Sequence, residues 1–287
     1  SIGQGFKAPD FRQLFLDFTN AAAGSYSVFG AAQAQQVIAR LDALGQIGNL
    51  FPNYYLLKAL KPEYSNGMHF TWDWKINPSS AMSVQLFRND IKNLIESQQV
   101  GTYVSGAQIY SYLNIGRAFT TGFEVEGQHR FNANWSINGG YQYLRTGDKD
   151  QIAAIKSGTV YTKNSQGYSR LMKLNEYVGL PNTSTHKLQV KLNYNSPKGY
   201  YLNLRAIYRS KWAVNNNNGN EVFDNGDVFA SGYVAINSAA GKSFKNGVSI
   251  QGGIDNISNY IDATNLPNLP GRTFYTSIKY QLQQNKN

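Results

Sequence analysis

The sequence predicts an all-β protein, a transmembrane antiparallel β-barrel, from three observations. Apolar and polar residues alternate with a period of two over segments of about ten residues. Aromatic residues make up 14% of the chain and charged residues only 15%, which suits a wall with one face in lipid and the other in water. Tight turns also alternate with long connections along the chain, as is typical of bacterial outer-membrane barrels.

The alternation is clearest at residues 64–76, where an apolar face separates from a polar face. The apolar positions are Met68, Phe70, Trp72, Trp74 and Ile76. The polar positions are Gly67, His69, Thr71, Asp73 and Lys75. A turn at 77–80 follows, and the next strand lies within 82–96, where the pattern weakens at Arg88.

The longest alternating segment covers residues 107–131. Its apolar positions are Leu113, Ile115, Phe119, Phe123 and Val125. At ~3.3 Å per residue this strand is longer than a bilayer is thick, so we expect it to project beyond the membrane. A turn at 132–134 then leads to a strand that begins at Trp135.

The rest of the chain repeats this arrangement. Further strands are expected at 187–194, 200–209, 232–244, 248–257 and 271–282, the last of them including Leu282. Two more tight turns are expected at 196–199 and 245–247, whereas long connections are expected near 97–106, 146–182, 212–231 and 258–270. Tight turns at one end of the strands and long loops at the other end indicate an outer-membrane barrel.

The segment 7–63 differs, because it shows no alternation. We interpret it as a long extracellular loop. Residues 31–44 have helical spacing and end at Gly45, which predicts a short helix that packs on its own loop or acts as a lid over a ligand. The loop aromatic residues predicted to contact a ligand are Tyr26, Phe29, Tyr54 and Tyr55. Packing of the loop on itself is the alternative for each of them.

The polar face of the strands bears charged residues, so we expect it to line a lumen rather than a packed core. His69, Glu124 and Glu126 are its lumen-facing polar residues. His69 with Asp73 suggests a metal or proton site, and the alternative is a solvated histidine. The two glutamates suggest acid–base chemistry, but carboxylates in a barrel wall more often pair with cations. We therefore expect no enzyme, no catalytic residue and no metal site.

The composition limits the classes of partner that the protein is expected to bind. The net charge is +10, but the Lys and Arg residues are scattered, so no nucleic-acid partner is expected. A basic surface also suits lipopolysaccharide, outer-membrane lipid or an anionic ligand. There is no cysteine, which excludes a disulfide framework and a thiolate metal site. The oxygen-rich segment 215–227 lacks the spacing of a calcium loop and is interpreted as a polar loop.

Three segments together resemble TonB-dependent outer-membrane receptors. Residues 3–16 contain Phe6, Lys7, Ala8 and Pro9, similar to the family's Gly-Phe-Arg-Ala-Pro motif with Lys in place of Arg. Residues 60–63 read Leu-Lys-Pro-Glu, and residues 112–126 resemble the family's Asn…Ala…Gly-x-Glu strand. Asn256 and the final segment from Gly271 fit the family's C-terminal end, and the long insertion after Pro9 is similar to receptors of the Bacteroidota type.

The resemblance implies a fold and a function. Residues 1–287 would be the C-terminal part of the barrel, about the last ten strands of a 22-stranded barrel with a plugged lumen. The N-terminal plug would be absent, and the chain, which starts without a signal peptide, would continue upstream. The location would be the bacterial cell outer membrane, with the TonB complex as a partner through the plug and a surface lipoprotein as a further partner.

The implied activity is active import of a scarce, bulky nutrient. A ferric siderophore, haem or cobalamin would be the transported ligand, with no covalently bound cofactor. The segment 7–63 contains no His, which disfavours haem for this part of the chain. The alternatives are a passive porin and a barrel-anchored surface adhesin or assembly component.

Overall fold

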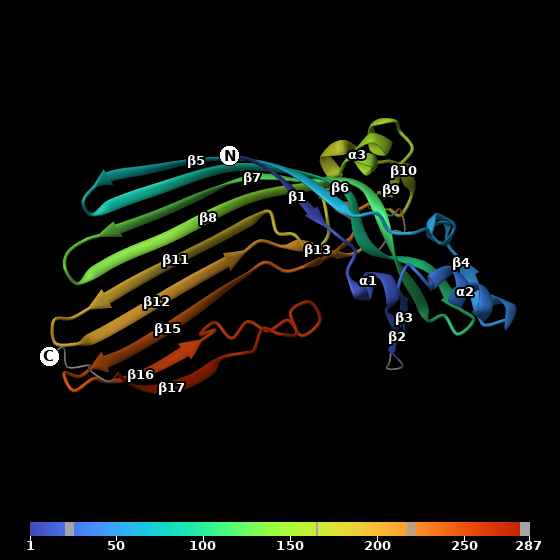
Figure 1. Ribbon diagram of the computed structural model, residues 1–287. Helices are drawn as coiled ribbons and strands as arrows, with labels where there is room; N and C mark the ends of the chain where they lie inside the picture. The colour runs from blue at the N-terminus through green and yellow to red at the C-terminus, as the bar shows by residue number, and fades with distance from the viewer. Residues whose placement is uncertain (21–25, 165, 217–219, 221, 282–287) are drawn as a thin grey trace. The chain divides into compact units, whose positions relative to one another are not determined.

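The computed structural model describes residues 1–20, 26–164, 166–216, 220 and 222–281. Most of these residues form β-strands, and the main sheet follows a single meander (Figure 1). Its strands, in spatial order, are β1 (Ile2–Lys7), β5 (Glu63–Asn77), β6 (Ser80–Tyr103), β7 (Gln108–Arg130), β8 (Trp135–Asp148), β11 (His186–Asn195), β12 (Tyr200–Arg209), β15 (Tyr233–Ser243), β16 (Val248–Asp255) and β17 (Thr273–Tyr280). Neighbours on this path whose register is described pair antiparallel. The all-β prediction and the expectation of about ten strands are confirmed.

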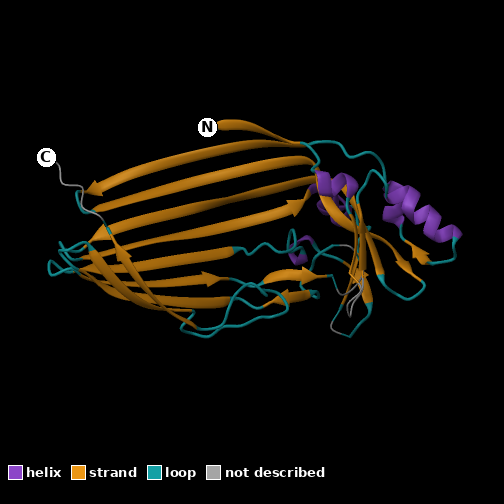
Figure 2. Cartoon of the chain, turned by 60° about the horizontal axis from the view of Figure 1, so that its bottom comes forward, coloured by secondary structure: helices purple, strands orange, loops and turns teal. Residues whose placement is uncertain are grey.

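None of the helices in the described ranges combines the length and the apolar character that crossing a membrane requires. Each helix belongs to a connection between two long strands of the main sheet (Figure 2).

The four tight turns lie where the sequence predicts them, and side chains or glycines explain each. The Asn77 carboxamide accepts a hydrogen bond from the Ser79 amide at 2.8 Å. Asn132 accepts from the amide of Trp135 at 2.9 Å. Gly199 and Gly247 adopt φ values of +83° and +85°, which glycine tolerates without strain. Local chemistry alone therefore ends these strands.

One predicted loop is wrong. We expected a long connection near 97–106, but β6 continues to Tyr103 and β7 starts at Gln108. The extended ends of these strands pair with strands of the segment 7–63, β4 (Ile47–Leu50) with β6 and β3 (Tyr26–Phe29) with β7. This pairing satisfies backbone groups that a sequence pattern cannot assign, because the partners are far apart in the chain.

The chain divides into two compact units. The first contains Ser1–Met68, Asn89–Phe119 and Asp148–Asp150, and the second contains His69–Arg88, Thr120–Gly147 and Gln151–Asn287. In the first unit, the segment 7–63 is more regular than expected. Besides β3 and β4 it contains α1 (Phe11–Phe15), β2 (Asp17–Asn20), α2 (Ala34–Ala43) and η1 (Pro52–Leu56).

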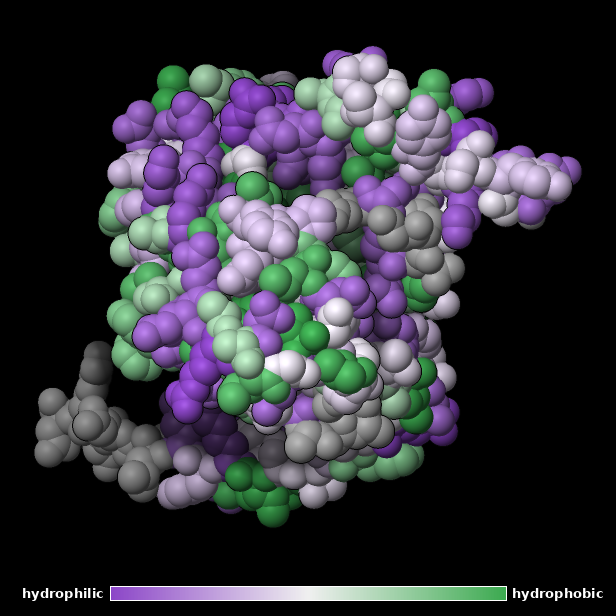
Figure 3. All heavy atoms as spheres, turned by 90° about the vertical axis from the view of Figure 1, so that its right-hand side faces the viewer, coloured by the Kyte–Doolittle hydropathy of each residue, from purple (hydrophilic) through white to green (hydrophobic). Residues whose placement is uncertain are grey.

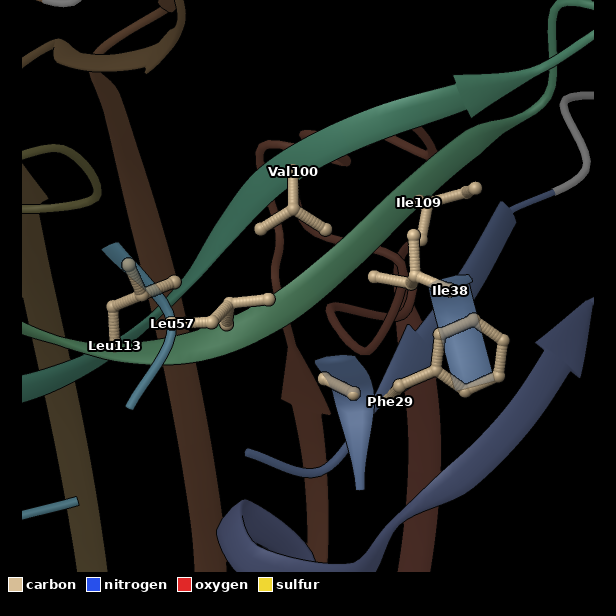
Figure 4. Packing of buried hydrophobic residues seen from close by; sticks show 7 residues of the cluster. Phe29, Ile38, Leu57, Val100, Ile109 and Leu113 are labelled. Carbon is tan, nitrogen blue, oxygen red and sulfur yellow. The ribbon is translucent and has the colours of Figure 1, made fainter. Parts of the chain in front are cut away.

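The predicted short helix is confirmed as α2. Gly45 follows it with a φ of +68°, as a C-terminal glycine should. Ile38 is 1% exposed and packs in a core with residues of β3, β6 and β7 (Figure 4). The buried members of this core are Phe29, Ala34, Ile38, Leu57, Val100, Ile109 and Leu113. The helix thus packs within its own unit, and a lid role remains a prediction.

The same core changes what covers one residue of the apolar face. Alternation placed Leu113 on the lipid face with Phe123, but Leu113 is buried in the core of the first unit. The reason is that the folded segment 7–63 covers this end of β7, because Phe29, Ile38 and Leu57 pack in the same core as Leu113.

In the second unit, the register keeps the predicted apolar positions of β8, β11 and β12 on one face. Leu188 lies opposite Tyr141 on one side and opposite Tyr208 on the other. The aromatic residues of this face pair across strands, as Phe123 and Tyr141 do at 5.8 Å between ring centroids. Such cross-strand pairs are the usual units of sheet stabilisation.

The long connections of the second unit also contain structure. Strands β9 (Tyr161–Lys163) and β10 (Ser169–Leu171) pair, as do β13 (Trp212–Asn215) and β14 (Val228–Ala230). Helix α3 (Lys149–Lys156) and the short helix η2 (Leu174–Glu176) complete them. Ile155, Met172 and Val222 form a small buried cluster between these connections. The predicted polar loop 215–227 and the predicted strand end at Leu282 lie partly outside the described residues.

Candidate functional site

The family-like motifs meet in the first unit. Lys7 of the Gly-Phe-Lys-Ala-Pro segment lies opposite Glu63 of the Leu-Lys-Pro-Glu segment, and their side chains form an ion pair at 3.2 Å. Phe6 and Tyr64 pack edge to face at 5.4 Å beside them. Ala8 and Pro9 then end the strand before α1. These contacts join the two ends of the segment 7–63.

The third motif, residues 112–126, contacts the same part of the first unit through Asn114. The Asn114 carboxamide accepts a hydrogen bond from the Lys61 amide at 2.7 Å and donates to the Lys61 carbonyl at 2.9 Å. It also donates to the Asn93 carbonyl at 2.7 Å. One side chain thus satisfies backbone groups of two other segments. The motif residues are therefore structural, because they determine where the long loop leaves the strands.

Three aromatic side chains form a row on the surface of the first unit, and we call Phe18, Tyr26 and Tyr110 the aromatic row. Tyr26 contacts Phe18 at 6.0 Å and Tyr110 at 6.2 Å between ring centroids. The parallel pairing of β3 with β7 brings the two tyrosines together. Burial, and secondarily Tyr26, raises the pKa of the Tyr110 phenol, so this phenol stays neutral and able to donate a hydrogen bond at physiological pH.

The four predicted ligand-contacting residues have different surroundings. Tyr26 belongs to the aromatic row. Phe29 is only 4% exposed and lies in the core. This burial agrees with the alternative that Phe29 packs the loop on itself. Tyr54 packs against the same core, whereas Tyr55 is 72% exposed and contacts Tyr54 edge to face at 5.3 Å. Tyr110 was not predicted from the sequence, because nothing in the local pattern indicates that β7 pairs with β3.

The predicted lumen residues lie along the polar face of the second unit. His69 contacts Gln85 through Nδ1 at 3.2 Å and stacks on Phe87. Glu124 accepts a hydrogen bond from Gln142 at 2.5 Å. Glu126 lines a hollow of about 810 Å³ together with polar residues of β5, β6, β7, β8 and β11. No group of three or more potential metal ligands occurs within the described part of the chain.

The same face has two pairs of basic residues on β11 and β12. Lys187 lies opposite Arg209, and Lys191 lies opposite Arg205. Arg205 donates to Gln189 at 3.1 Å, and Arg209 donates to Ser184 at 2.6 Å and lies over the Trp212 ring. Neither strand contains an acidic residue. Like charges directly opposite each other destabilise a sheet, so this face favours an anionic neighbour.

One ion pair of the described loops uses two hydrogen bonds and lies beside a short helix. Arg170 binds both carboxylate oxygens of Glu176 at the short helix η2. Hydrogen bonding to Arg170 is the main reason that the pKa of Glu176 falls to about 2.

In the first unit, burial and the nearby carboxylates of Asp148 and Glu63 raise the pKa of Glu96. That residue lies some 16 positions from the tight turn, beyond the roughly ten residues that span a bilayer.

The face of the molecule shown in Figure 3 mixes hydrophilic and hydrophobic side chains.

Comparisons with known proteins agree with this architecture. The family described as TonB dependent receptor-like, β-barrel, matches residues 1–257. The siderophore receptor PirA from Pseudomonas aeruginosa is similar in structure, with a TM-score of 0.58 and 15% identity over 96% of this chain and 38% of that one. A mutant of the ferric enterobactin receptor PfeA from the same organism has a TM-score of 0.60 and 18% identity over 96% and 37%.

The copper transporter OprC is similar as well, with a TM-score of 0.60 and 13% identity over 97% of this chain and 36% of that one. The chain thus spans somewhat more than a third of the length of these solved structures. Among curated proteins no sequence matches this chain.

Proposed function

The chain belongs to the TonB-dependent receptor-like β-barrel family of outer-membrane transport receptors, which are not enzymes, and we propose that the protein imports a metal chelate actively across the outer membrane. The observation that supports this proposal best is the junction of the three motifs at Lys7, Lys61 and Asn114. This junction anchors a large folded loop at the ends of the strands opposite the tight turns. A passive pore does not need such a loop, whereas a receptor that captures a bulky ligand does.

The ligand class proposed is a metal chelate, with a ferric siderophore ahead of haem or the cobalt complex cobalamin. Two features support an anionic, partly aromatic chelate. The aromatic row offers ring faces at the surface of the first unit. The basic pairs of β11 and β12 favour an anionic neighbour on the polar face of the second unit. The similar solved structures include a siderophore receptor, a ferric enterobactin receptor and a copper transporter.

The partners proposed follow from the family. The TonB complex would act through a plug domain, as the family implies. Lipopolysaccharide and a surface lipoprotein are further proposed partners, and the resemblance of the insertion after Pro9 to receptors of the Bacteroidota type supports the second. A passive porin and a surface adhesin or assembly component are the competing functions.

Uptake measurements distinguish these functions. Cells that lack their own iron receptors would express the full-length receptor, with and without a functional TonB, and receive radioactive ferric siderophores, haem or cobalamin. We expect uptake of a ferric siderophore that requires TonB. Uptake independent of TonB would indicate a porin, and no uptake of any of the three ligands would favour the adhesin.

The aromatic row provides the matched variants for this assay. Tyr26→Ala should weaken ligand binding by about fivefold, the loss expected for one aromatic contact. Tyr168→Ala is the control, because Tyr168 is an exposed loop tyrosine outside the row. Equal uptake by the Tyr26→Ala variant and the unmodified receptor would remove the aromatic row from the proposed ligand site.

A further inference from the structure

A lysine lies among the apolar positions of the sheet, where charge is costly. Lys242 of β15 lies opposite Tyr200 of β12 on one side and Ile250 of β16 on the other. Ala240 lies two positions before Lys242 on β15, and Leu202 of β12 lies opposite Ala240. Both residues are on the same apolar face as Lys242. In a barrel this face meets lipid, so the ammonium group of Lys242 must reach the polar headgroup region.

Aromatic groups hold the ammonium in place. Lys242 Nζ donates a hydrogen bond to the Tyr200 hydroxyl at 3.0 Å. It also lies 4.4 Å from the centroid of the Tyr200 ring and 5.1 Å from that of Phe244. An ammonium has three donors, and none of the ion pairs found in the described residues involves Lys242. The site is therefore a positioned cation without a protein carboxylate.

Two more lysines lie at the same strand ends. Lys245 is exposed in the turn between β15 and β16, and Lys198 is exposed in the turn between β11 and β12. The second turn lies against β15, because the Ser243 amide donates to the Gly199 carbonyl at 2.9 Å. No acidic residue occurs in either turn. Three lysines thus lie at the same ends of neighbouring strands.

We propose that Lys242, Tyr200 and the two turn lysines bind the phosphate of an anionic phospholipid. Tight turns of outer-membrane barrels face the periplasm, so the lipid belongs to the inner leaflet, whereas lipopolysaccharide lies at the opposite ends of the strands. Basic residues beside aromatic anchors suit such headgroups. This site rests on membership of the barrel family and does not depend on the imported ligand.

Native mass spectrometry of the purified full-length receptor tests the site. The probes are phosphatidylglycerol, zwitterionic phosphatidylethanolamine and lipopolysaccharide, each added separately in detergent. We expect phosphatidylglycerol to be retained in preference to phosphatidylethanolamine. Lys242→Gln should weaken its retention by about fivefold, the effect expected for one lysine near an anionic headgroup, and Lys242→Arg should preserve it.

Lys279→Gln is the matched control. Lys279 lies near the same end of the neighbouring β17, but on the polar face, opposite Ser249. Its removal changes the net charge equally and should leave lipid retention unchanged. The proposal would be overturned by equal losses in the Lys242→Gln and Lys279→Gln variants, by no loss in either, or by preferential retention of lipopolysaccharide that depends on Lys242. The shift in gel mobility of the folded barrel confirms that each variant folds.

Discussion

At the scale of single residues, one short polar side chain joins segments that are distant in the sequence. Asn114 bonds to the backbone of Lys61 and Asn93, which belong to two other parts of the first unit. An Asn can do this because its carboxamide both donates and accepts. The family-like motifs thus form one junction, although they are far apart in the sequence.

Replacing Asn114 tests this role. Asn114→Ala should lower the stability of the first unit by about 1–3 kcal/mol, because three hydrogen bonds to the backbone of Lys61 and Asn93 are lost and each contributes about 0.5–1.5 kcal/mol. Differential scanning calorimetry or denaturant unfolding of the full-length receptor measures the change. Asn193→Ala removes an exposed hydrogen bond to Asn138 and should change stability by less than about 0.5 kcal/mol. Equal effects of the two variants would contradict the junction.

The pair of Arg170 with Glu176 predicts a response to acid. Folding lowers the pKa of Glu176 from 4.5 to about 2, chiefly through hydrogen bonding to Arg170. A carboxyl whose pKa is lowered in the folded state stabilises that state above its unfolded pKa. This stabilisation is lost as the pH falls from about 4.5 toward 2.

Limited proteolysis with pepsin follows this loss. Cleavage near residues 169–176 should increase as the pH falls through that range. The Glu176→Gln variant lacks the titrating group, so its cleavage should depend much less on pH. A profile that is the same in both forms would show that another group controls the opening of this loop.

At the scale of elements, helix α2 shows how a loop gains a core of its own. Its Ile38 is buried against residues from β3, β6 and β7, whereas Leu44, just after the helix, is 62% exposed. The segment 7–63 therefore behaves as a small folded structure, with strands and helices that period-two alternation could not reveal. Its folding depends on contacts with strand ends that are remote in the sequence.

Truncation of Ile38 should unfold this structure selectively. Ile38→Ala removes a fully buried side chain and should cost about 2–5 kcal/mol. We expect faster trypsin cleavage at Arg40, which lies on the same helix, with the mobility of the folded barrel unchanged. Leu44→Ala is the control and should leave the cleavage rate unaltered. No difference between the two variants would show that α2 is held by other contacts.

At the scale of the whole molecule, the alternation of faces decides which surface meets lipid. In the membrane-spanning part of β5, Phe70 lies on the apolar face and Thr71 on the polar face. Exposed apolar residues in such number are expected only where lipid covers them. The register with neighbouring strands then carries this assignment across the second unit.

Fluorescent labels on single cysteines test that assignment, since the chain contains no cysteine of its own. A label on Phe70→Cys should be quenched by brominated lipid when the full-length receptor is reconstituted in vesicles. A label on Thr71→Cys should be quenched far less, because its side chain faces away from the lipid. Stronger quenching at the second position would mean that the register is shifted by one residue.

The sequence by itself determined the class of fold, the apolar face of each strand, the four tight turns and the helix α2. Alternation, turn residues and helical spacing are local properties, so they act on the chain before any distant contact forms. Tertiary structure alone decided the extension of β6 and β7, the burial of Leu113 and Phe29, and the meeting of Tyr26 with Tyr110. These features depend on pairing between residues that are far apart in the chain, and a period of two assigns a residue to a face without naming what covers that face.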